Sequence, residues 1–348
     1  MTYMAFPRIE RGKDMEGVKQ MKNVTVIIPN YNGIGFLRDC IEALEKQTYR
    51  DFDVVVVDNG SSDGSAAWLS EKGITTICMG ENTGFSGAVN VGIRQAKTPY
   101  VILLNNDTVA EPGFVGALVK AAGRSEKIFA VSSRMIQLYH KELMDSAGDM
   151  YCLLGWAYQR GVGQSSKGYR REREVFSACA GAAIYRRKVF EEIGYFDEKH
   201  FAYLEDLDVC YRAKIFGYHN LYCPQAVVYH VGSGTSGSKY NDFKVRLAAR
   251  NNLYVIYKNM PWPQLLVNSP GLLTGILLKY GFFKKIGFKK AYVEGLKEGI
   301  RTVGACKKAA FRKEHLENYL AIQWELITGT FLYAYEFSKR KLKAVRKV

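Results

Sequence analysis

Proline, paired cysteines and acidic residues are scarce in this sequence, and each scarcity narrows what the protein can be. Only 8 of the 348 residues are proline, against 33 glycines, and 47% of the residues are hydrophobic. This composition excludes collagen-like and disordered chains and leaves a globular protein. The seven cysteines are odd in number and include no C-x-x-C pair. They argue against a disulfide framework or a zinc site and favour free thiols in a reducing, cytoplasmic compartment.

Long uninterrupted apolar runs are also lacking. Residues 1–22 carry charges throughout, so we interpret them as an N-terminal extension and not as a signal peptide. The segment 265–283 is largely apolar, but Pro270, Gly271, Gly275 and Lys279 interrupt it. A membrane-spanning helix needs about 20 continuous apolar residues. The segment is therefore poor material for a spanning helix.

The shortage of acidic residues is concentrated at one end of the chain. Lys and Arg number 49 against 34 Asp and Glu, a net charge of +15, and residues 258–348 alone hold 18 basic and 6 acidic residues. A basic tail suits an anionic surface such as a membrane, a nucleic acid or a phosphorylated carrier. The apolar segment with its lysines at 284, 285, 289 and 290 fits a helix lying in a membrane interface. A core helix of a small C-terminal subdomain with a solvated charged face explains it equally well.

Short apolar runs alternate with amphipathic stretches from residue 24 onward. The pattern predicts strands at 24–29, 53–58, 75–79 and 100–105, with helices at 36–47, 66–72 and 86–96. Continuous Val, Ile and Leu runs mark strands that are covered on both faces, and their alternation with helices predicts a parallel, Rossmann-like sheet. After a looser stretch up to about residue 174, we expect a strand at 175–185, helices at 188–193 and 206–216, and a strand at 226–230.

Polar side chains follow several of these strands, at the edge where such sheets bind ligands. Asp58 ends the second strand, where its carboxylate can accept hydrogen bonds from a base imide or a ribose hydroxyl. Asp63, in the turn that follows, is more simply interpreted as a cap. Gly84, Gly87 and Asn90 open the next helix, where small residues let a nucleotide approach backbone N–H groups. The absence of G-x-G-x-x-G and Walker A patterns from this stretch weakens the dinucleotide and NTPase interpretations.

Three carboxylates, Glu205, Asp206 and Asp208, lie within four residues at the start of a predicted helix. Crowded like charges raise at least one pKa, as a general base requires, while the helix N-terminus partly opposes that shift. Alternatively, Asp206 could cap the helix, and Asp208 is spaced to pair with Arg212. A lone His230 at the end of the strand at 226–230 is by itself more often structural than a metal ligand.

Six motifs in order resemble the family 2 glycosyltransferases of the GT-A fold, closest to bacterial rhamnosyltransferase-like members. They are I-I-P-N-Y-N, V-V-D-N-G-S-S-D-G, G-E-N-T-G-F-S-G-A-V-N-V-G-I, L-L-N-N-D, Y-L-E-D-L-D-V-C-Y-R and V-V-Y-H. The resemblance implies a mixed α/β sheet flanked by helices over residues 23–259, followed by a basic, partly amphipathic helical region at 260–348. One departure stands out, because Asn105-Asn106-Asp107 replaces the usual D-x-D.

The resemblance also assigns roles to individual residues. It implies that Asp206 is the base that deprotonates the acceptor hydroxyl, with Glu205 supporting it. It implies a Mg²⁺ or Mn²⁺ ion held by Asp107 and His230. Contacts to the nucleotide sugar are implied for Pro29, Asn30, Tyr31, Asn32, Asp58, Asn59, Asn82, Gly84, Gly87, Asn90, Asn105, Asn106, Asp107 and Arg250. For Arg250, a solvated helix face is about as good an interpretation.

The function implied is an inverting glycosyltransferase, because one base and no candidate nucleophile indicate a single in-line displacement. We expect a nucleotide-diphosphate sugar donor, first dTDP-L-rhamnose, and a hydroxyl acceptor on a cell-surface glycan or lipid-linked saccharide. We also expect peripheral contact with the inner face of the cell membrane. Two rivals are a catalytically silent nucleotide-binding subunit of a membrane polysaccharide assembly and a nucleic-acid-binding protein. Only the net charge supports the second rival, because no aromatic-interleaved RNA motif accompanies it, so we expect no nucleic-acid partner.

Overall fold

The computed structural model describes residues 22–232 and 240–345. Most of the predicted N-terminal extension, residues 233–237 of the glycine-rich stretch after His230, and the last three residues of the basic tail lie outside the described residues.

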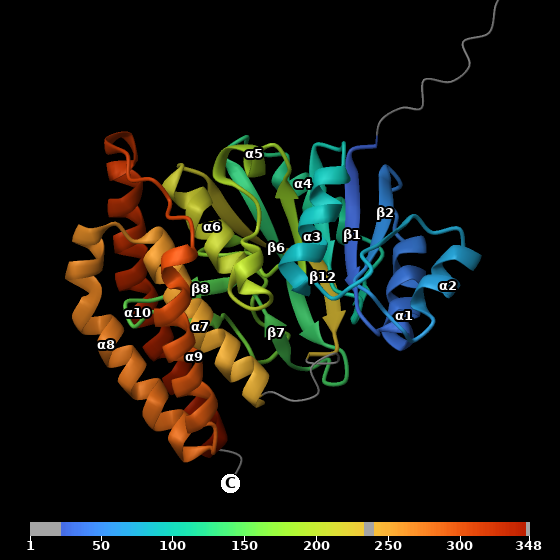
Figure 1. The fold of residues 1–348 in the computed structure, drawn as a ribbon. Coiled ribbons are helices and arrows are strands. Elements are labelled where there is room, and N and C mark those ends of the chain that lie inside the picture. The colour runs from blue at the N-terminus through green and yellow to red at the C-terminus, as the bar shows by residue number, and fades with distance from the viewer. Residues whose placement is uncertain (1–21, 233–239, 346–348) are drawn as a thin grey trace, which may run out of the picture.

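One mixed sheet forms the centre of the molecule (Figure 1). Its strands run in the order β10-β12-β6-β11-β4-β1-β2-β3, with β5 paired to β12 and β7 to β6. The strands β4, β1, β2 and β3 are mutually parallel, whereas β11 runs antiparallel to both β4 and β6. Their bounds are β1 Val24–Asn30, β2 Phe52–Asp58, β3 Thr76–Cys78, β4 Tyr100–Leu104, β5 Thr108–Ala110, β6 Ile128–Gln137, β7 Met144–Ser146, β10 Arg173–Val175, β11 Ala182–Arg186 and β12 His219–His230.

Helices cover both faces of this sheet because alternate strand residues point to opposite sides. Val26 and Ile28 join a core with α1 and α4, whereas Ile27 joins a second core with α3, α5 and α6. The helices are α1 Ile34–Glu45, α2 Ser65–Glu71, α3 Gly84–Gln95, α4 Phe114–Ala122, α5 Val189–Ile193 and α6 Glu205–Ile215. The fold is therefore the predicted α/β type, a mixed sheet flanked by helices.

The predicted strand at 175–185 is wrong in one respect, because two strands occupy the region. β10 ends at Val175 and β11 begins at Ala182. Between them, the backbone N–H groups of Phe176 and Ser177 donate to the carbonyl of Asp149, so the chain leaves the main sheet here. Asp149 begins β8 (Asp149–Tyr151), which pairs with β9 (Ala157–Gln159) in a separate hairpin.

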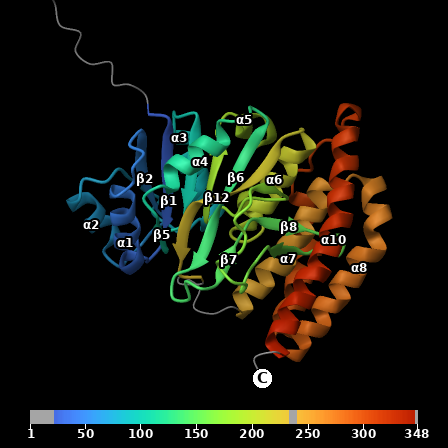
Figure 2. The ribbon, with the colours of Figure 1, turned by 180° about the vertical axis from the view of Figure 1, so that it is seen from behind.

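Four helices follow the sheet and stand at the end of the molecule opposite α1 and α2, as both views show (Figures 1 and 2). They are α7 Asp242–Asn259, α8 Trp262–Lys285, α9 Lys289–Thr302 and α10 Leu316–Val345, and short 3₁₀ turns lie at Glu198–His200, Val303–Ala305 and Lys313–His315. Tyr319, Ile322 and Leu326 of α10 pack against α6 in a shared core. None of the described helices combines the length and apolarity that crossing a membrane requires.

Candidate active site

The carboxyl ends of β1, β2 and β4 bring three predicted residues into one hydrogen-bond network. Asn30 lies at its centre. Its amide nitrogen donates to Asp58 Oδ2 at 3.1 Å, and its oxygen accepts from Asn106 Nδ2 at 2.7 Å. All three side chains are buried. Because β1 pairs with β2 and β4, the apolar runs of the sequence dictate this meeting of polar groups.

The turn after Asp58 is closed by the side chain of Asp58 and by that of Asn32 from the loop after β1. Asp58 Oδ1 accepts from the backbone N–H of Ser61 at 2.9 Å, and Asn32 Oδ1 accepts from that of Ser62 at 2.8 Å. Tyr31 is exposed beside this turn and Pro29 is half-buried. Asp63 accepts from the N–H groups of Ile34 and Ser65, so it holds the starts of two helices, as its interpretation as a cap predicts.

Other predicted nucleotide contacts are occupied inside the protein. Asn59 bonds Thr83 and Asn82, and thereby shapes the turn before α3. Asn90 donates to the carbonyl of Phe196 and accepts from its N–H group. Gly84 has a φ of +76°, and a Cβ there would lie 2.5 Å from the Phe201 carbonyl oxygen. At Gly87 a Cβ would lie 2.5 Å from Thr83 Oγ1, so packing inside the protein already accounts for both glycines.

Asp107 and His230 come together although 123 residues separate them, because β5, which begins directly after Asp107, pairs with the end of β12. His230 Nε2 lies 3.2 Å from Asp107 Oδ1, and His230 Nδ1 lies 2.8 Å from Asp145 Oδ2. The sequence reasoning missed Asp145. It comes from β7 and completes a carboxylate–imidazole–carboxylate chain, in which the second carboxylate orients the ring.

The arrangement of Asp107, His230 and Asp145 fits a divalent cation. The distance between His230 Nε2 and Asp107 Oδ1 is that of an ion pair, but Asp107 Oδ1 is buried without a hydrogen-bond partner among the described residues. Burial opposes protonation of His230, yet the two neighbouring carboxylates outweigh it and raise its pKa to about 10. One nitrogen and one carboxylate suit Mn²⁺ as well as Mg²⁺, because both ions complete their shells with water or phosphate oxygens.

Asp206 lies in the first turn of α6 and is held by two backbone N–H groups. Its oxygens accept from Leu207 at 2.8 Å and Ala180 at 3.2 Å. Leu204 occupies the N-cap position of α6, so Asp206 does not cap it. Burial raises the pKa of Asp206 despite these hydrogen bonds. For Glu205, burial first and then the charge of Asp206 raise the pKa, and its Oε2 has no partner among the described residues.

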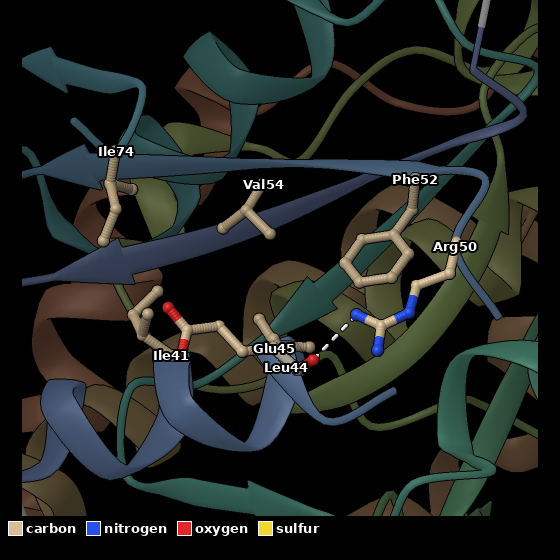
Figure 3. A pocket seen from close by; sticks show the side chains of 7 residues that line it. All are labelled: Ile41, Leu44, Glu45, Arg50, Phe52, Val54 and Ile74. Carbon is tan, nitrogen blue, oxygen red and sulfur yellow. Dashed lines mark hydrogen bonds between the residues drawn. The ribbon is translucent and has the colours of Figure 1, made fainter. Parts of the chain in front are cut away.

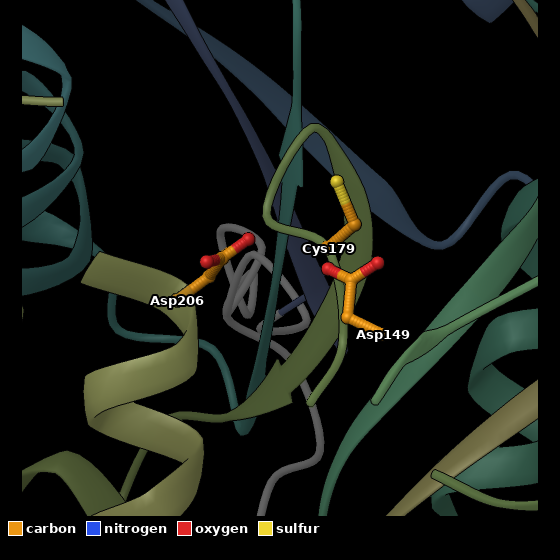
Figure 4. A group of neighbouring side chains, drawn as sticks. All are labelled: Asp149, Cys179 and Asp206. Carbon is orange, nitrogen blue, oxygen red and sulfur yellow. The ribbon is translucent and has the colours of Figure 1, made fainter. Parts of the chain in front are cut away.

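A second missed residue, Asp149, lies opposite Asp206, with Cys179 beside it (Figure 4). One side-chain ligand atom from each of the three lies within 4.8 Å of those of the other two. Burial, followed by the charge of Asp206, raises the pKa of Asp149 well above its usual value, and burial likewise raises the pKa of the Cys179 thiol. We interpret the two carboxylates as a coupled pair, in which the charge of Asp206 disfavours ionisation of Asp149.

The loop that carries Glu205 and Asp206 is strained and anchored from α7. Phe201, Tyr203 and Leu204 all have positive φ values between 62° and 72°. Asn251 Nδ2 donates to the carbonyls of His200, Ala202 and Tyr203 at 2.8–2.9 Å. Arg250 donates to the carbonyls of Lys199 and His200 and pairs with Glu298 at 2.9 Å. Arg250 is therefore not on a solvated face, and its contact with the nucleotide sugar stays a prediction.

Asp208 has the structural role that its spacing allows. It pairs with Arg212 at 2.9 Å and with Lys258 of α7 at 2.8 Å. Burial opposes its ionisation, but these two cations outweigh that effect and hold the pKa of Asp208 well below its usual range. Asp208 thus stays ionised and ties α6 to α7.

Two surface depressions are lined by other residues. One is an apolar hollow between α1 and β2, where Arg50 Nη1 donates to the Glu45 carbonyl at 2.7 Å (Figure 3). The other is a basic hollow beside β12 that includes Arg134, Lys141 and Lys167. Neither includes Asp58, Asp107, Asp206 or His230 among its lining residues.

Comparison with known proteins identifies the family of the sheet region. Residues 25–194 match the family model described as Glycosyl transferase family 2. The chain carries a family 2 glycosyltransferase domain. The matched span includes Asp58, Asp107, Asp145 and Asp149 and ends before Asp206 and His230.

Relatives and solved structures point the same way. The domain is similar to the N-acetylglucosaminyl-diphospho-decaprenol L-rhamnosyltransferase of Mycobacterium tuberculosis, with 29% identity over 61% of this chain and 77% of the relative. It also resembles the mannosyltransferase PcManGT of Pyrobaculum calidifontis in complex with GDP-Man and Mn²⁺, with a TM-score of 0.51 and 16% identity over 90% of this chain and 87% of that one. GalNAc-T7 with UDP, GalNAc and Mn²⁺ gives a TM-score of 0.56 and 16% identity over 68% of this chain and 48% of that one. At these identities the structures show the fold alone, which is GT-A.

Proposed function

We propose that this protein is an inverting glycosyltransferase that moves a sugar from a nucleotide-diphosphate donor to an acceptor hydroxyl. The observation that carries the proposal is the placement of Asp206. A carboxylate with a raised pKa lies in the first turn of α6, and the family 2 domain supplies a separate acidic edge at Asp58 and Asp107. A base needs a pKa near the working pH, which burial of Asp206 favours.

In this proposal each group of residues has a defined task. Asp58, held by Asn30, accepts hydrogen bonds from the nucleoside. Asp206 takes the proton of the acceptor hydroxyl as that oxygen bonds to the anomeric carbon of the sugar. The bond between that carbon and the diphosphate oxygen breaks, and the nucleoside diphosphate leaves with the electron pair. The attack and the departure lie on opposite faces of the sugar, so its configuration inverts.

Asp107 and His230 are the residues that would hold a Mg²⁺ or Mn²⁺ ion. When bound, such an ion offsets the negative charge of the departing diphosphate. Asp145 would keep His230 Nε2 turned toward Asp107, since its own carboxylate occupies Nδ1.

The donor and acceptor follow the named relative. The mycobacterial relative is named for rhamnosyl transfer to a diphospho-decaprenol saccharide, which supports dTDP-L-rhamnose as the first donor to test and a lipid-linked saccharide as the acceptor. A lipid-linked acceptor would bring the protein to the cytoplasmic face of the membrane. The basic C-terminal region supports such peripheral contact.

One observation favours a second candidate, a catalytically silent nucleotide-binding subunit. The segment that replaces D-x-D offers a single carboxylate, Asp107. The amide nitrogen of Asn106 is already bound, because it donates to Asn30. A single carboxylate with His230 suffices for a metal bound together with a diphosphate. The silent-subunit candidate therefore differs from ours in predicting binding without turnover.

The test is a screen of dTDP-, UDP- and GDP-sugars for binding and for donor hydrolysis, with Mn²⁺ and with EDTA. We expect one donor to turn over only with metal, and Asp206→Asn to lower the transfer rate by roughly 10²–10⁴-fold. Asp107→Ala should abolish the metal-dependent turnover, whereas Asp53→Asn, which changes an exposed carboxylate on β2, should behave like the wild type. Binding without turnover of any donor would favour the silent subunit, and no binding at all would refute the nucleotide site.

A further inference from the structure

The outward faces of α8 and α10 are unusually apolar. Nineteen large hydrophobic side chains are exposed in the described part of the chain, and thirteen of them lie on these two helices. On α8 they are Trp262, Leu266, Val267, Leu273, Leu277, Leu278 and Phe282. On α10 they are Leu316, Leu320, Trp324, Phe331, Tyr335 and Phe337. The helical spacing of most of them forms a stripe on each helix, and we call the two stripes the α8/α10 face.

Two polar side chains of α8, those of Gln264 and Asn268, point inward, the reverse of an ordinary surface helix. Gln264 and Asn268 are buried, and both donate to Gln323 Oε1 of α10 at 2.9–3.0 Å. Gln323 in turn donates to Asn268 Oδ1 at 2.7 Å. These bonds join the two helices side by side, so their apolar stripes lie next to each other. An inverted helix of this kind is suited to an apolar surrounding on its outer side.

The charges around the α8/α10 face indicate which partner would cover it. α8 contains no acidic residue, and it ends in exposed Lys284 and Lys285, followed by exposed Lys289 and Lys290. On the outward side of the described part of α10 the acidic residue is Glu317, near the start of the helix. Both helices end toward the lower edge of Figure 1, so the lysines gather at one end of the face. A second copy of the chain would carry the same positive charge, whereas anionic lipid carries the opposite one.

We propose that the α8/α10 face lies flat on an anionic lipid bilayer, with its apolar side chains in the interface and its lysines on the headgroups. The inference rests on the membrane location in the proposed function and names the surface that makes the contact. A 24-residue helix is roughly 36 Å long, so α8 offers an extended contact parallel to the membrane. Trp262, Trp324 and Tyr335 are side chains that favour the interface, because their rings are apolar and their polar tips stay hydrated.

The face also has a consistent relation to the candidate active site. β12, which carries His230, ends toward the same lower edge as α8 and α10 (Figure 1). The lysine-bearing end of the face and the end of β12 therefore lie toward the same edge of the molecule. A lipid-linked acceptor could present its sugar there without leaving the membrane.

The experiment measures cosedimentation of the full chain with large vesicles of phosphatidylcholine alone and with 30% phosphatidylglycerol, chosen as roughly the anionic content that gives a strong surface potential. We expect binding to the anionic vesicles that weakens as salt rises. The double variant Leu277→Ser/Phe331→Ser places one polar residue on each stripe. It should lower the partition coefficient between vesicles and buffer at least tenfold, because two apolar side chains are lost from the interface. Lys284→Gln/Lys285→Gln should lower it roughly fivefold for each lysine on anionic vesicles only.

Ile300→Ser is the matched control, because Ile300 is 72% exposed but lies on the outward face of α9 beside charged residues. It should bind vesicles like the wild type. All these sites are exposed, so the variants should melt like the wild type. Wild-type protein that ignores anionic vesicles, or a double variant that binds as well as the control, would overturn the proposal. So would a wild-type dimer in solution that the double variant converts to a monomer without vesicle binding.

Donor hydrolysis in detergent-free buffer separates this inference from the proposed function. If the double variant hydrolyses donor normally but does not bind vesicles, both proposals stand. If the wild type binds vesicles through this face but turns over no donor, the membrane inference stands and the enzyme proposal fails.

Discussion

At the scale of single residues, Asp149 gives a pH-dependent prediction. Its pKa is raised well above the usual value, because burial and then the charge of Asp206 disfavour its ionised form. In the unfolded chain it loses its proton near pH 4. The free energy of unfolding therefore falls as the pH rises from that value through the pKa of Asp149 in the folded protein. Asp149→Asn removes this loss, so the variant should gain little thermal stability at pH 4 and clearly more at pH 7.5.

Melting curves at the two pH values check this prediction, with Asp53→Asn as the exposed control. Transfer assays add a second reading. Asn resembles the protonated acid, so Asp149→Asn should keep most of the transfer rate, whereas Asp206→Asn should lose it. A stability gain that is the same at both pH values would contradict the raised pKa of Asp149. Loss of transfer in both variants would make Asp149 a base candidate in its own right.

The residues of the candidate site were predictable from sequence where they end a strand. Asn30, Asp58 and Asn106 meet because parallel strands bring their carboxyl ends to one edge. Asp145 and Asp149 were missed, although D-S-A-G-D places two carboxylates around Gly148, whose φ is +87°. Asn90 and Arg250 matched family motifs, but their partners, the carbonyls of Phe196 and His200, are distant in sequence and could not be read from a motif.

At the scale of elements, the strained loop before α6 depends on α7. Asn251 supplies one nitrogen to three loop carbonyls, and three residues of the loop hold positive φ values that cost free energy. Asn251→Ala leaves those carbonyls without this donor. We expect a loss of about 1–3 kcal/mol of unfolding free energy and a lower kcat, because the start of α6 carries Asp206.

Denaturant unfolding and transfer kinetics measure the two effects. Asn252→Ala is the matched control, since Asn252 is the buried neighbour whose Oδ1 has no partner in the described part of the chain. It should leave kcat near the wild-type value. If Asn251→Ala lowers stability but leaves kcat and KM unchanged, then Asn251 does not position the base.

The elements themselves followed from local pattern to differing degrees. Buried apolar runs predicted β1, β2, β3 and β4 within a residue or two of their observed bounds. The region 175–185 failed because its apolar residues serve two environments. Val175 closes a short strand against β12, and Phe176 packs against the C-terminal helices. Such a division depends on partners far along the chain, which periodicity does not encode.

At the scale of the whole molecule, the sequence left open whether residues 260–348 bind membrane or pack as a subdomain. Packing as a subdomain concerns the inner side of these helices, and the proposed membrane binding concerns their outward side. Leu326 of α10 is fully buried in the core that includes Tyr211 of α6. Lys214 of α6 also pairs with Glu325 at 2.9 Å. Composition shows that a segment is apolar and basic, but only the fold shows which side of it is covered.

Because the inner side of α10 packs against α6, we expect the C-terminal helices to unfold together with the sheet. Leu326→Ala should therefore lower the unfolding free energy of the whole protein by about 2–5 kcal/mol, because it leaves a cavity against α6. Leu320→Ala, on the outward side of the same helix and 63% exposed, should leave it unchanged. Thermal unfolding followed by calorimetry and by loss of nucleotide binding should report one transition at one temperature. If Leu326→Ala instead melts the C-terminal helices in a separate step while nucleotide binding persists to the wild-type temperature, the helices are an appendage, and the packing against α6 does not support the site.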